Sequence, residues 1–359
     1  MDQKLQKKLT KRIEEGTLRS LSSFDGYIDF FSNDYLGFSK LKLNFTDIQQ
    51  YSSTGSRLIS GTSSQSLSTE KFLAAFFKAE AALIFNSGYD ANIGFFGSIP
   101  QRGDTVLYDE LIHASIRDGI RLSFADSVSF KHNDFEDLKT KLNKISGVKY
   151  VVIESLYSMD GDIAPLLEFV KVCKEDNVYL IVDEAHACGV FGENGKGLIS
   201  QYNLDNEVFV RIITFGKAFG SHGACVVGEK SLITYLINFS RSFIYTTALS
   251  PESYNRIKEV LRAKNFSEQQ ELLQENIFYF RSNLKNKFCI SDLNSPIQLI
   301  KIGEIEKTKQ LATQLQHLNI AVKPIFSPTV PIGSEGLRIC FHSFNTKVEI
   351  DLLVAVLNG

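Results

Sequence analysis

The feature of this chain that most constrains its fold is the alternation of short apolar runs with helical segments through its central part. The runs are rich in β-branched residues and have the length of buried strands. They occupy residues 81–85, 105–108, 149–154, 178–183, 208–214 and 224–228. Strands that alternate with helices predict an α/β fold whose mainly parallel sheet is covered on both faces, with the carboxyl ends of the strands at one edge.

Changes in the pattern of apolar and polar residues along the sequence predict three parts of the chain. Residues 1–40 are expected to form a short N-terminal arm, which begins with an amphipathic helix because leucine and isoleucine recur at every fourth position. Residues 41–262 carry the alternating pattern and form the large domain. Residues 263–359 contain a long helical pattern at 267–287 followed by shorter strands and helices, which predicts a smaller C-terminal α+β domain.

Composition narrows the class of protein. The chain has 359 residues, room for about two domains, and a formal net charge of −2, so no basic excess would attract nucleic acid or an anionic membrane. We expect no membrane span and no secretory signal, because no long apolar run occurs and the N-terminus is charged. The five cysteines form no CxxC pair, which favours reduced, buried thiols in a cytoplasmic protein.

The sequence motifs of several other protein classes are incomplete or absent. The tetrapeptide at 183–186 spells a helicase box, but neither Gly-Lys pair is followed by the Ser or Thr of a phosphate loop. The sequence contains no GxSxG motif, which argues against an α/β-hydrolase. No GxGxxG motif follows the first strand, which argues against a Rossmann dehydrogenase. His186 and Cys188 lack the further paired ligands of a zinc site, so no metal is expected.

Lys217 is the first candidate for chemistry. It follows the apolar run at 208–214 and is flanked by Gly216, Ala218 and Gly220. Desolvation at the end of a buried strand favours the neutral amine, which can form a Schiff base with a carbonyl compound. The small neighbours would let a planar ligand approach the backbone closely. Taken alone, the residue is more simply interpreted as a solvated lysine at a strand end, because most lysines in proteins are solvated.

Other polar groups fall at the same predicted edge. Asp183 ends an apolar run, where a carboxylate must be paired; it could cap the next segment, form a salt bridge or hold a pyridinium N–H. The turn at 86–90 opens a helix, whose free N–H groups make a phosphate site. The further strand-end residues are Gly88, Tyr89, His113, Ser158, His186 and Thr214. Their convergence favours a binding site over separate structural roles.

Seven motifs together resemble the α-oxoamine synthase family of pyridoxal-phosphate enzymes. They are SNDYLG at 32–37, GSRLISG at 55–61, NSGYDAN at 86–92, ESLYSMDGD at 154–162, DEAHACGVFGENGKG at 183–197, TFGKAFG at 214–220 and FIYTTALSP at 243–251. They agree with the family in order and spacing, and the similarity runs from about Arg19 to the C-terminus. The resemblance implies an aspartate-aminotransferase-like large domain, PLP fold type I, with pyridoxal 5′-phosphate as the cofactor.

The resemblance also implies roles for single residues. Lys217 would hold the cofactor covalently and later move the substrate α-proton, and Asp183 would pair with the pyridine nitrogen. His113 would stack on the ring, and His186 and Ser158 would bond its phenolic oxygen. The phosphate would be held by Gly88, Tyr89 and Thr214, and by Thr246 of a neighbouring subunit. The substrate-binding positions would be Arg19, Asn33, His113, Thr329 and Arg338.

The implied reaction is a decarboxylating condensation of L-alanine with a pimeloyl thioester, carried on CoA or a carrier protein, in biotin biosynthesis. The implied assembly is a homodimer with shared active sites. Ser66, Cys188 and Lys196 depart from the usual family residues, which leaves the acyl-chain and carrier contacts open. Two alternatives remain: a sister enzyme that uses glycine, and a non-catalytic homologue that acts as a binding protein.

Overall fold

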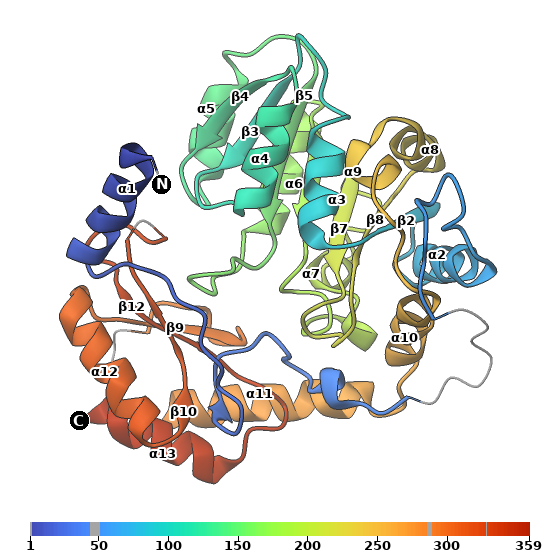
Figure 1. Ribbon diagram of the computed structural model, residues 1–359. Helices are drawn as coiled ribbons and strands as arrows, with labels where there is room; N and C mark the ends of the chain where they lie inside the picture. Colours follow the sequence, from blue (N-terminus) through green and yellow to red (C-terminus); the bar gives the residue numbers. More distant parts are fainter. Residues whose placement is uncertain (1, 44–50, 286–288, 328) are drawn as a thin grey trace.

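A seven-stranded sheet forms the centre of the computed structural model, which describes residues 2–43, 51–285, 289–327 and 329–359 (Figure 1). The strand order is β2-β8-β7-β6-β5-β3-β4. Strand β8 is antiparallel to both neighbours and the other neighbouring pairs are parallel, so the predicted mainly parallel sheet is confirmed. The strands are β2 (Ala81–Phe85), β3 (Thr105–Asp109), β4 (Asp126–Phe130), β5 (Lys149–Glu154), β6 (Tyr179–Asp183), β7 (Val210–Thr214) and β8 (Ala224–Gly228).

Helices cover both faces of this sheet because its strands are apolar on both sides. Along β2, Leu83 and Phe85 join one buried cluster, whereas Ala82 and Ile84 join the other. The first cluster includes α3 (Gly88–Phe96), α4 (Ala114–Leu122), α8 (Lys230–Phe239) and α9 (Arg241–Ile244). The second includes α2 (Ser64–Phe76), α5 (Phe135–Leu142), α6 (Leu166–Glu175), α7 (Leu198–Gln201) and α10 (Pro251–Leu261).

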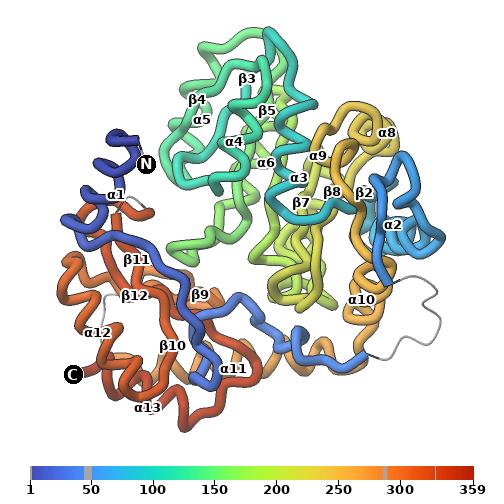
Figure 2. Tube along the Cα trace, viewed as in Figure 1, coloured from blue at the N-terminus to red at the C-terminus, as the bar shows by residue number. Residues whose placement is uncertain are grey.

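The C-terminal part has a smaller sheet of its own with flanking helices, the α+β arrangement that the sequence predicts, and it shares one buried cluster with the central sheet. Its antiparallel sheet has the order β11-β12-β9. A second pairing brings the N-terminal strand β1 (Ile28–Asp29) alongside β10 (Ile320–Ala321), and Figure 2 shows this blue segment running beside the red C-terminal chain. The elements are α11 (Phe266–Asn283), β9 (Ile297–Lys301), α12 (Ile305–His317), β11 (Lys323–Ile325), β12 (Gly336–Cys340) and α13 (Lys347–Asn358). The boundaries at 1–40, 41–262 and 263–359 stay predictions.

Some predicted elements differ from the observed ones. The sequence predicts a helix over 70–77, but helix α2 starts at Ser64, because the Ser63 and Ser66 side chains form a capping box. The sequence also predicts a strand over 27–31, but only the two-residue β1 forms there. The long helix expected at 267–287 ends at Asn283, and 286–288 lie outside the described residues. The short elements are α1 (Gln3–Glu14), η1 (Phe38–Lys40) and η2 (Glu193–Gly195).

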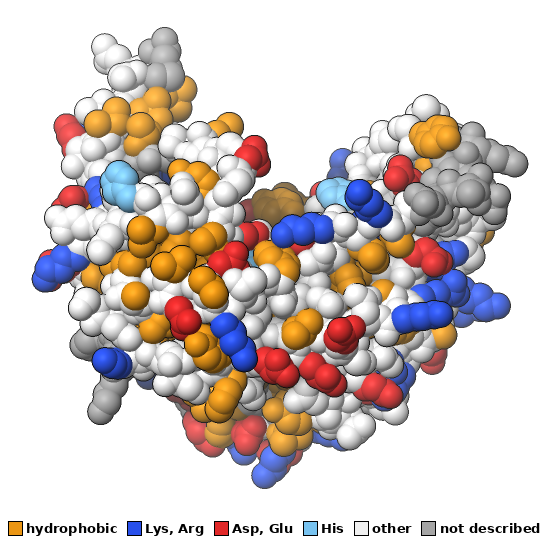
Figure 3. Space-filling view, turned by 90° about the horizontal axis from the view of Figure 1, so that it is seen from below, with side chains coloured by type: hydrophobic (Ala, Val, Ile, Leu, Met, Phe, Trp, Pro, Cys, Tyr) orange, Lys and Arg blue, Asp and Glu red, His pale blue; other side chains and the backbone are white. Residues whose placement is uncertain are grey.

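The surface carries mixed charge. Figure 3 shows a hollow between two projections, with acidic and basic side chains interspersed over the face below it.

No described helix is both long and apolar enough to span a bilayer. All five cysteines are free, and all but Cys289 are buried, as the composition predicts.

Candidate active site

Lys217 lies on the loop that joins β7 to the antiparallel strand β8. The loop is closed by backbone bonds, in which Phe215 donates to Gly223 at 2.9 Å and Ser221 donates to Phe215 at 2.9 Å. The Lys217 side chain is half-buried. Burial lowers its pKa from 10.5 to about 8, and this effect outweighs the neighbouring carboxylates of Asp183 and Glu154. The amine is therefore much easier to deprotonate than an ordinary lysine.

Two carboxylates lie side by side at the carboxyl ends of β5 and β6, near enough to Lys217 for their charges to act on its amine. Glu154 and Asp183 are register partners on the two parallel strands, so their side chains share one face. Asp183 accepts from Nδ2 of Asn92 at 3.0 Å and from the backbone of Ala185 at 2.9 Å. Burial, reinforced by the charge of Asp183, raises the pKa of Glu154 to about 8. The pair can therefore carry one negative charge, on Asp183, and one exchangeable proton, on Glu154. The charge on Asp183 is suited to hold the protonated nitrogen of a ligand ring.

Glu154 is a site residue to which the sequence analysis assigned no role. Its carboxylate accepts a 2.6 Å hydrogen bond from the backbone N–H of His113, and so it fixes the start of α4. Its sequence signal is the same as that of Asp183: each is an acidic residue at the end of a β-branched run.

The sequence pattern predicts that His113 lies on the helix that follows the strand at 105–108, but His113 is the N-cap of α4 and stands just before that helix begins. Its Nδ1 accepts from the backbone N–H of Ser115 at 3.2 Å and lies 2.7 Å from the Ser115 hydroxyl. The residue is exposed, yet its surroundings lower the pKa of the imidazole by desolvation. A neutral ring held by its own cap is suited to lie flat against a planar ligand.

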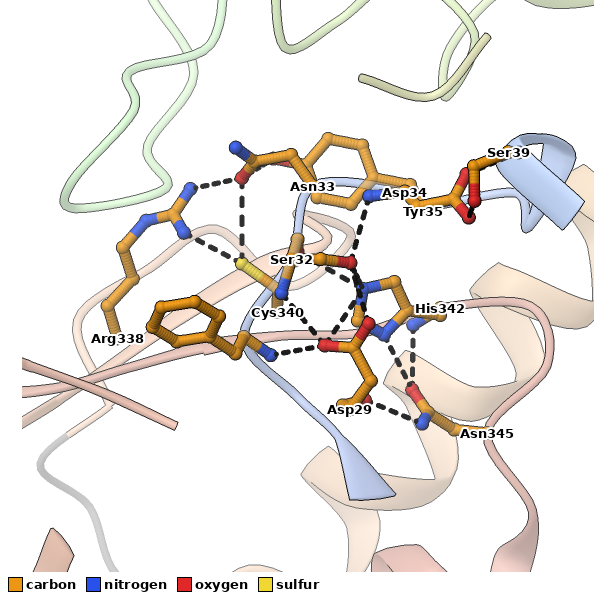
Figure 4. Close-up of polar contacts among 11 residues, drawn as sticks. Asp29, Ser32, Asn33, Asp34, Tyr35, Ser39, Arg338, Cys340, His342 and Asn345 are labelled. Atoms are coloured by element: carbon orange, nitrogen blue, oxygen red, sulfur yellow. Dashed lines mark hydrogen bonds and ion pairs between the residues drawn. The ribbon is translucent and has the colours of Figure 1, made fainter. Parts of the chain in front are cut away.

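A chain of contacts joins the central sheet to the C-terminal part, and Figure 4 shows the portion of it that contains Tyr35, Asn33 and Arg338. The hydroxyl of Tyr35 lies 2.8 Å from Nδ1 of His186 and 3.2 Å from Oδ1 of Asn33. The same Oδ1 accepts from Nη2 of Arg338 at 3.0 Å. Burial lowers the pKa of His186 well below the usual range, with further contributions from Lys217 and Arg338. His186 is therefore a neutral imidazole with one ring proton.

Arg338 is a buried cation without an anionic partner among the residues that the structure describes. Its side chain, only 6% exposed as a residue, donates to three neutral acceptors: the Ser158 carbonyl at 2.7 Å, the Cys340 sulfur at 2.8 Å and the Asn33 amide oxygen. No carboxylate of the described residues lies within 4.0 Å of its nitrogens. Buried charges in proteins are normally paired, so this guanidinium is suited to an anion supplied by a ligand.

The start of α3 forms a cradle for an anion. The Ser87 hydroxyl caps the helix by accepting from the backbone of Asp90 at 3.1 Å. Gly88 and Tyr89 direct their N–H groups to no acceptor within the described part of the chain. A Cβ at Gly88 would lie 2.6 Å from Oγ1 of Thr214, so the backbone and this hydroxyl share one small space. Free N–H groups at a helix N-terminus are suited to a phosphate.

The remaining predicted residues lie around this centre. Ser158 and Thr329 line one cavity of about 50 Å³, together with Leu111 and Pro331. Thr246 accepts from Nδ2 of Asn86 at 3.1 Å, next to the cradle of its own chain. Arg19 is exposed after α1 and makes no hydrogen bond to another described residue, so its substrate role stays a prediction.

A larger cavity lies away from these residues. It measures about 220 Å³ and is lined by Phe77, Val210 and Gly228, near the amino end of β7. It contains none of the predicted site residues, so its size does not make it the candidate site.

The residues present fit pyridoxal 5′-phosphate. A lysine with a lowered pKa faces the paired carboxylates, His113 offers a flat neutral ring, and Gly88 offers a backbone cradle that a Cβ would fill. These are the three groups that the cofactor needs for its carbonyl carbon, its ring and its phosphate.

Comparison with known proteins gives consistent relatives. The sequence pattern of the family described as "Aminotransferase class I and II" matches residues 25–357. An 8-amino-7-oxononanoate synthase of Emericella nidulans is 40% identical over 91% of this chain and 87% of its own. A high-resolution structure of SPT with its PLP internal aldimine has a TM-score of 0.88 at 26% identity, over 99% of this chain and 96% of that chain. An 8-amino-7-oxononanoate synthase from Francisella tularensis has a TM-score of 0.77 at 29% identity, over 93% and 97% of the two chains.

Proposed function

This chain belongs to the class I and II aminotransferase family, and on that premise we propose that it condenses L-alanine with a pimeloyl thioester to give 8-amino-7-oxononanoate, carbon dioxide and a free thiol. It is a pyridoxal-phosphate-dependent acyltransferase with the aspartate-aminotransferase-like PLP fold type I. Its relatives support a place among the α-oxoamine synthases of biotin biosynthesis.

The observation that carries the proposal is the unpaired guanidinium of Arg338. It is joined through Asn33 and Tyr35 to His186, which lies close to Lys217. An amino acid whose α-carboxylate pairs with this guanidinium can present its amine and Cα toward Lys217. Arginine is suited to this task because its planar fork binds a carboxylate through two parallel hydrogen bonds.

When bound, pyridoxal phosphate supplies an electron sink for negative charge that develops at Cα of the amino acid. Nζ of Lys217 would hold the cofactor, and as a free amine it would remove and return the proton at Cα. Asp183, fixed by Asn92, would hold the ring nitrogen, and His113 would lie against the ring.

The phosphate would bind the N–H groups of Gly88 and Tyr89 and the hydroxyl of Thr214. His186 and Ser158 would bind the phenolic oxygen, and the backbone carbonyl of Ser158 accepts a hydrogen bond from Arg338. These roles are proposals that rest on position in the motifs and on the geometry given above.

For the acyl substrate, we propose that the cavity beside Ser158 and Thr329 lies on the acyl side of the site. The departures from the family sequence have structural partners in this chain. The Ser66 hydroxyl completes the cap of α2, and the Cys188 thiol donates to the Lys196 carbonyl at 3.7 Å.

We further propose a cytoplasmic homodimer, in which Thr246 reaches the phosphate site of the partner subunit. Its position beside Asn86, two residues before the cradle, puts the residue at the edge of the cofactor site. Analytical ultracentrifugation tests this proposal: a dimer is expected, and a fully active monomer would contradict it.

The test of function is a matrix of amino acids against acyl thioesters with thiol release as the readout. L-Alanine with a pimeloyl thioester should give the highest kcat/KM, and the Lys217→Ala variant should release no thiol. A preference for glycine would indicate the sister enzyme. A protein that binds no pyridoxal phosphate, and so stays colourless, would indicate the non-catalytic homologue.

A further inference from the structure

We propose that Tyr35 is a positioning residue that decides which ring nitrogen of His186 carries the proton. Through that choice it would turn His186 into a hydrogen-bond donor toward the cofactor. This inference rests on the proposed position of pyridoxal phosphate, but it does not depend on which amino acid or acyl thioester reacts.

The geometry gives the phenolic proton of Tyr35 two acceptors. The hydroxyl lies 2.8 Å from Nδ1 of His186 and 3.2 Å from Oδ1 of Asn33. Tyr35 is 0% exposed, so water does not compete for this proton, and the ring is held in place by the core. A phenol has a single proton, and therefore only one of the two contacts can be its donated bond.

Arg338 makes Asn33 the weaker of the two acceptors for the Tyr35 proton. Its Nη2 donates to the same Oδ1 of Asn33 at 3.0 Å, which also fixes that amide with its oxygen toward the guanidinium. Donation from a cation draws electron density away from this oxygen and occupies one of its lone pairs. The shorter contact, with Nδ1 of His186, is then the better acceptor for the Tyr35 proton.

The consequence for His186 follows from its charge state. The buried ring is neutral and has one proton, so an Nδ1 that accepts from Tyr35 leaves the proton on Nε2. Nε2 has no partner among the described residues, whereas Nδ1 is occupied. His186 therefore presents an unused N–H near Lys217, which is what an anionic phenolic oxygen requires.

The opposite arrangement would be unfavourable. If Tyr35 donated to Asn33 instead, His186 would donate from Nδ1 to the Tyr35 oxygen and keep a bare lone pair on Nε2. That lone pair would face an anionic oxygen with no proton between them, and a buried unmade hydrogen bond is costly. The contacts of Tyr35 thus link the substrate-side cation, Arg338, to the electronics of the cofactor ring.

The first test needs no substitution. In the full-length protein labelled with ring-¹⁵N histidine, without cofactor, the His186 signals should show the proton on Nε2. The His186→Gln variant assigns these signals among the six histidines. A proton found on Nδ1 of His186 in the unmodified chain would overturn the proposal, whatever substrate the enzyme uses.

The second test uses the loaded protein. In Tyr35→Phe the tautomer of His186 is no longer fixed, and the pH midpoint of the visible absorbance change should rise by about one unit, because a donor to the phenolic oxygen is weakened. The Tyr254→Phe variant is the matched control: it removes another buried hydroxyl, packed against Arg57, and should leave the midpoint unchanged. Equal midpoints in Tyr35→Phe and unmodified protein would refute the idea.

The two proposals fail separately. If the protein took up no pyridoxal phosphate, the proposed function would be lost, but the NMR measurement would still decide the tautomer. If alanine reacted as expected and His186 showed the Nδ1 proton, only the role of Tyr35 would be wrong.

Discussion

The Arg338→Lys substitution gives the sharpest test of the substrate-carboxylate site. The guanidinium uses three nitrogens toward Ser158, Cys340 and Asn33, and it is the buried cation without a carboxylate partner described above. Lysine keeps the positive charge but replaces the planar fork with a single ammonium on a flexible stem. The change therefore removes bidentate geometry while leaving electrostatic attraction in place.

The expected magnitude follows from the burial of the site. Truncating one partner of a buried, hydrogen-bonded charge pair costs about 2–5 kcal/mol, and the retained charge places this variant at the lower end. A loss of about 2–3 kcal/mol corresponds to a roughly 30- to 150-fold lower kcat/KM for L-alanine. Most of the change should appear as a higher KM for L-alanine.

The assay is initial-rate thiol release at saturating acyl thioester, with L-alanine varied. Cofactor absorbance should be retained, because Arg338 makes its contacts on the substrate side. The matched control is Arg262→Lys, an exposed arginine paired with Glu259 on the surface, which should leave both constants unchanged. If a folded, cofactor-loaded Arg338→Lys enzyme had an unchanged KM for L-alanine, Arg338 would not be the carboxylate site.

Three further predictions concern cofactor loading and stability. Because the pKa of Lys217 is lowered to about 8, the nucleophilic neutral amine forms as pH rises through that value, and stopped-flow uptake of pyridoxal phosphate by the apo-protein should accelerate there; a flat profile between about pH 7 and 9 would contradict this. In Gly88→Ala the new Cβ crowds Oγ1 of Thr214 at 2.6 Å, so the cofactor Kd from absorbance titration should rise about tenfold, and an unchanged Kd would rule out the phosphate cradle. Arg211→Met leaves the buried Glu184 carboxylate without its 2.7 Å donor, so urea unfolding should show about 3–5 kcal/mol less stability, with Lys139→Met at the exposed pair with Glu175 as the near-neutral control.

The central sheet could be predicted because its strands are continuous apolar runs. The run at 149–154 and that at 224–228 coincide with β5 and β8. Strand β4 was missed for a physical reason: it is an edge strand in which residues 126–129 are exposed or half-buried, so it has no apolar run to mark it. The sequence pattern reveals strands with buried side chains, including the edge strand β2, and it overlooks a strand such as β4 whose side chains are mostly exposed or half-buried.

The candidate site also contains residues that could be predicted from the sequence and a contact that could not. Asp183 and Thr214 end apolar runs, and Lys217 follows one, so their common edge could be inferred from the chain alone. The contact between Tyr35 and His186 joins positions 151 residues apart, and no local pattern marks Tyr35 as more than a core residue. Such a contact depends on how the N-terminal segment packs between the sheet and β12, which only the three-dimensional structure provides.

The antiparallel direction of β8 explains why the lysine loop is well suited to chemistry. A parallel strand after β7 would require a long crossover connection, whereas the antiparallel β8 returns through a short closed loop. That loop is docked on the N-terminal segment: a Cβ at Gly220 would lie 2.0 Å from the Ser39 nitrogen.

Arg256 then fastens the two segments together, because it donates to the Gly220 carbonyl at 3.0 Å and to the Phe38 carbonyl at 2.6 Å. Lys217 and the segment that carries Tyr35 and Asn33 are therefore held by one guanidinium. This shared support can keep an amine, a ring proton and a substrate-binding cation at fixed relative positions, as a site that moves a proton at one carbon requires.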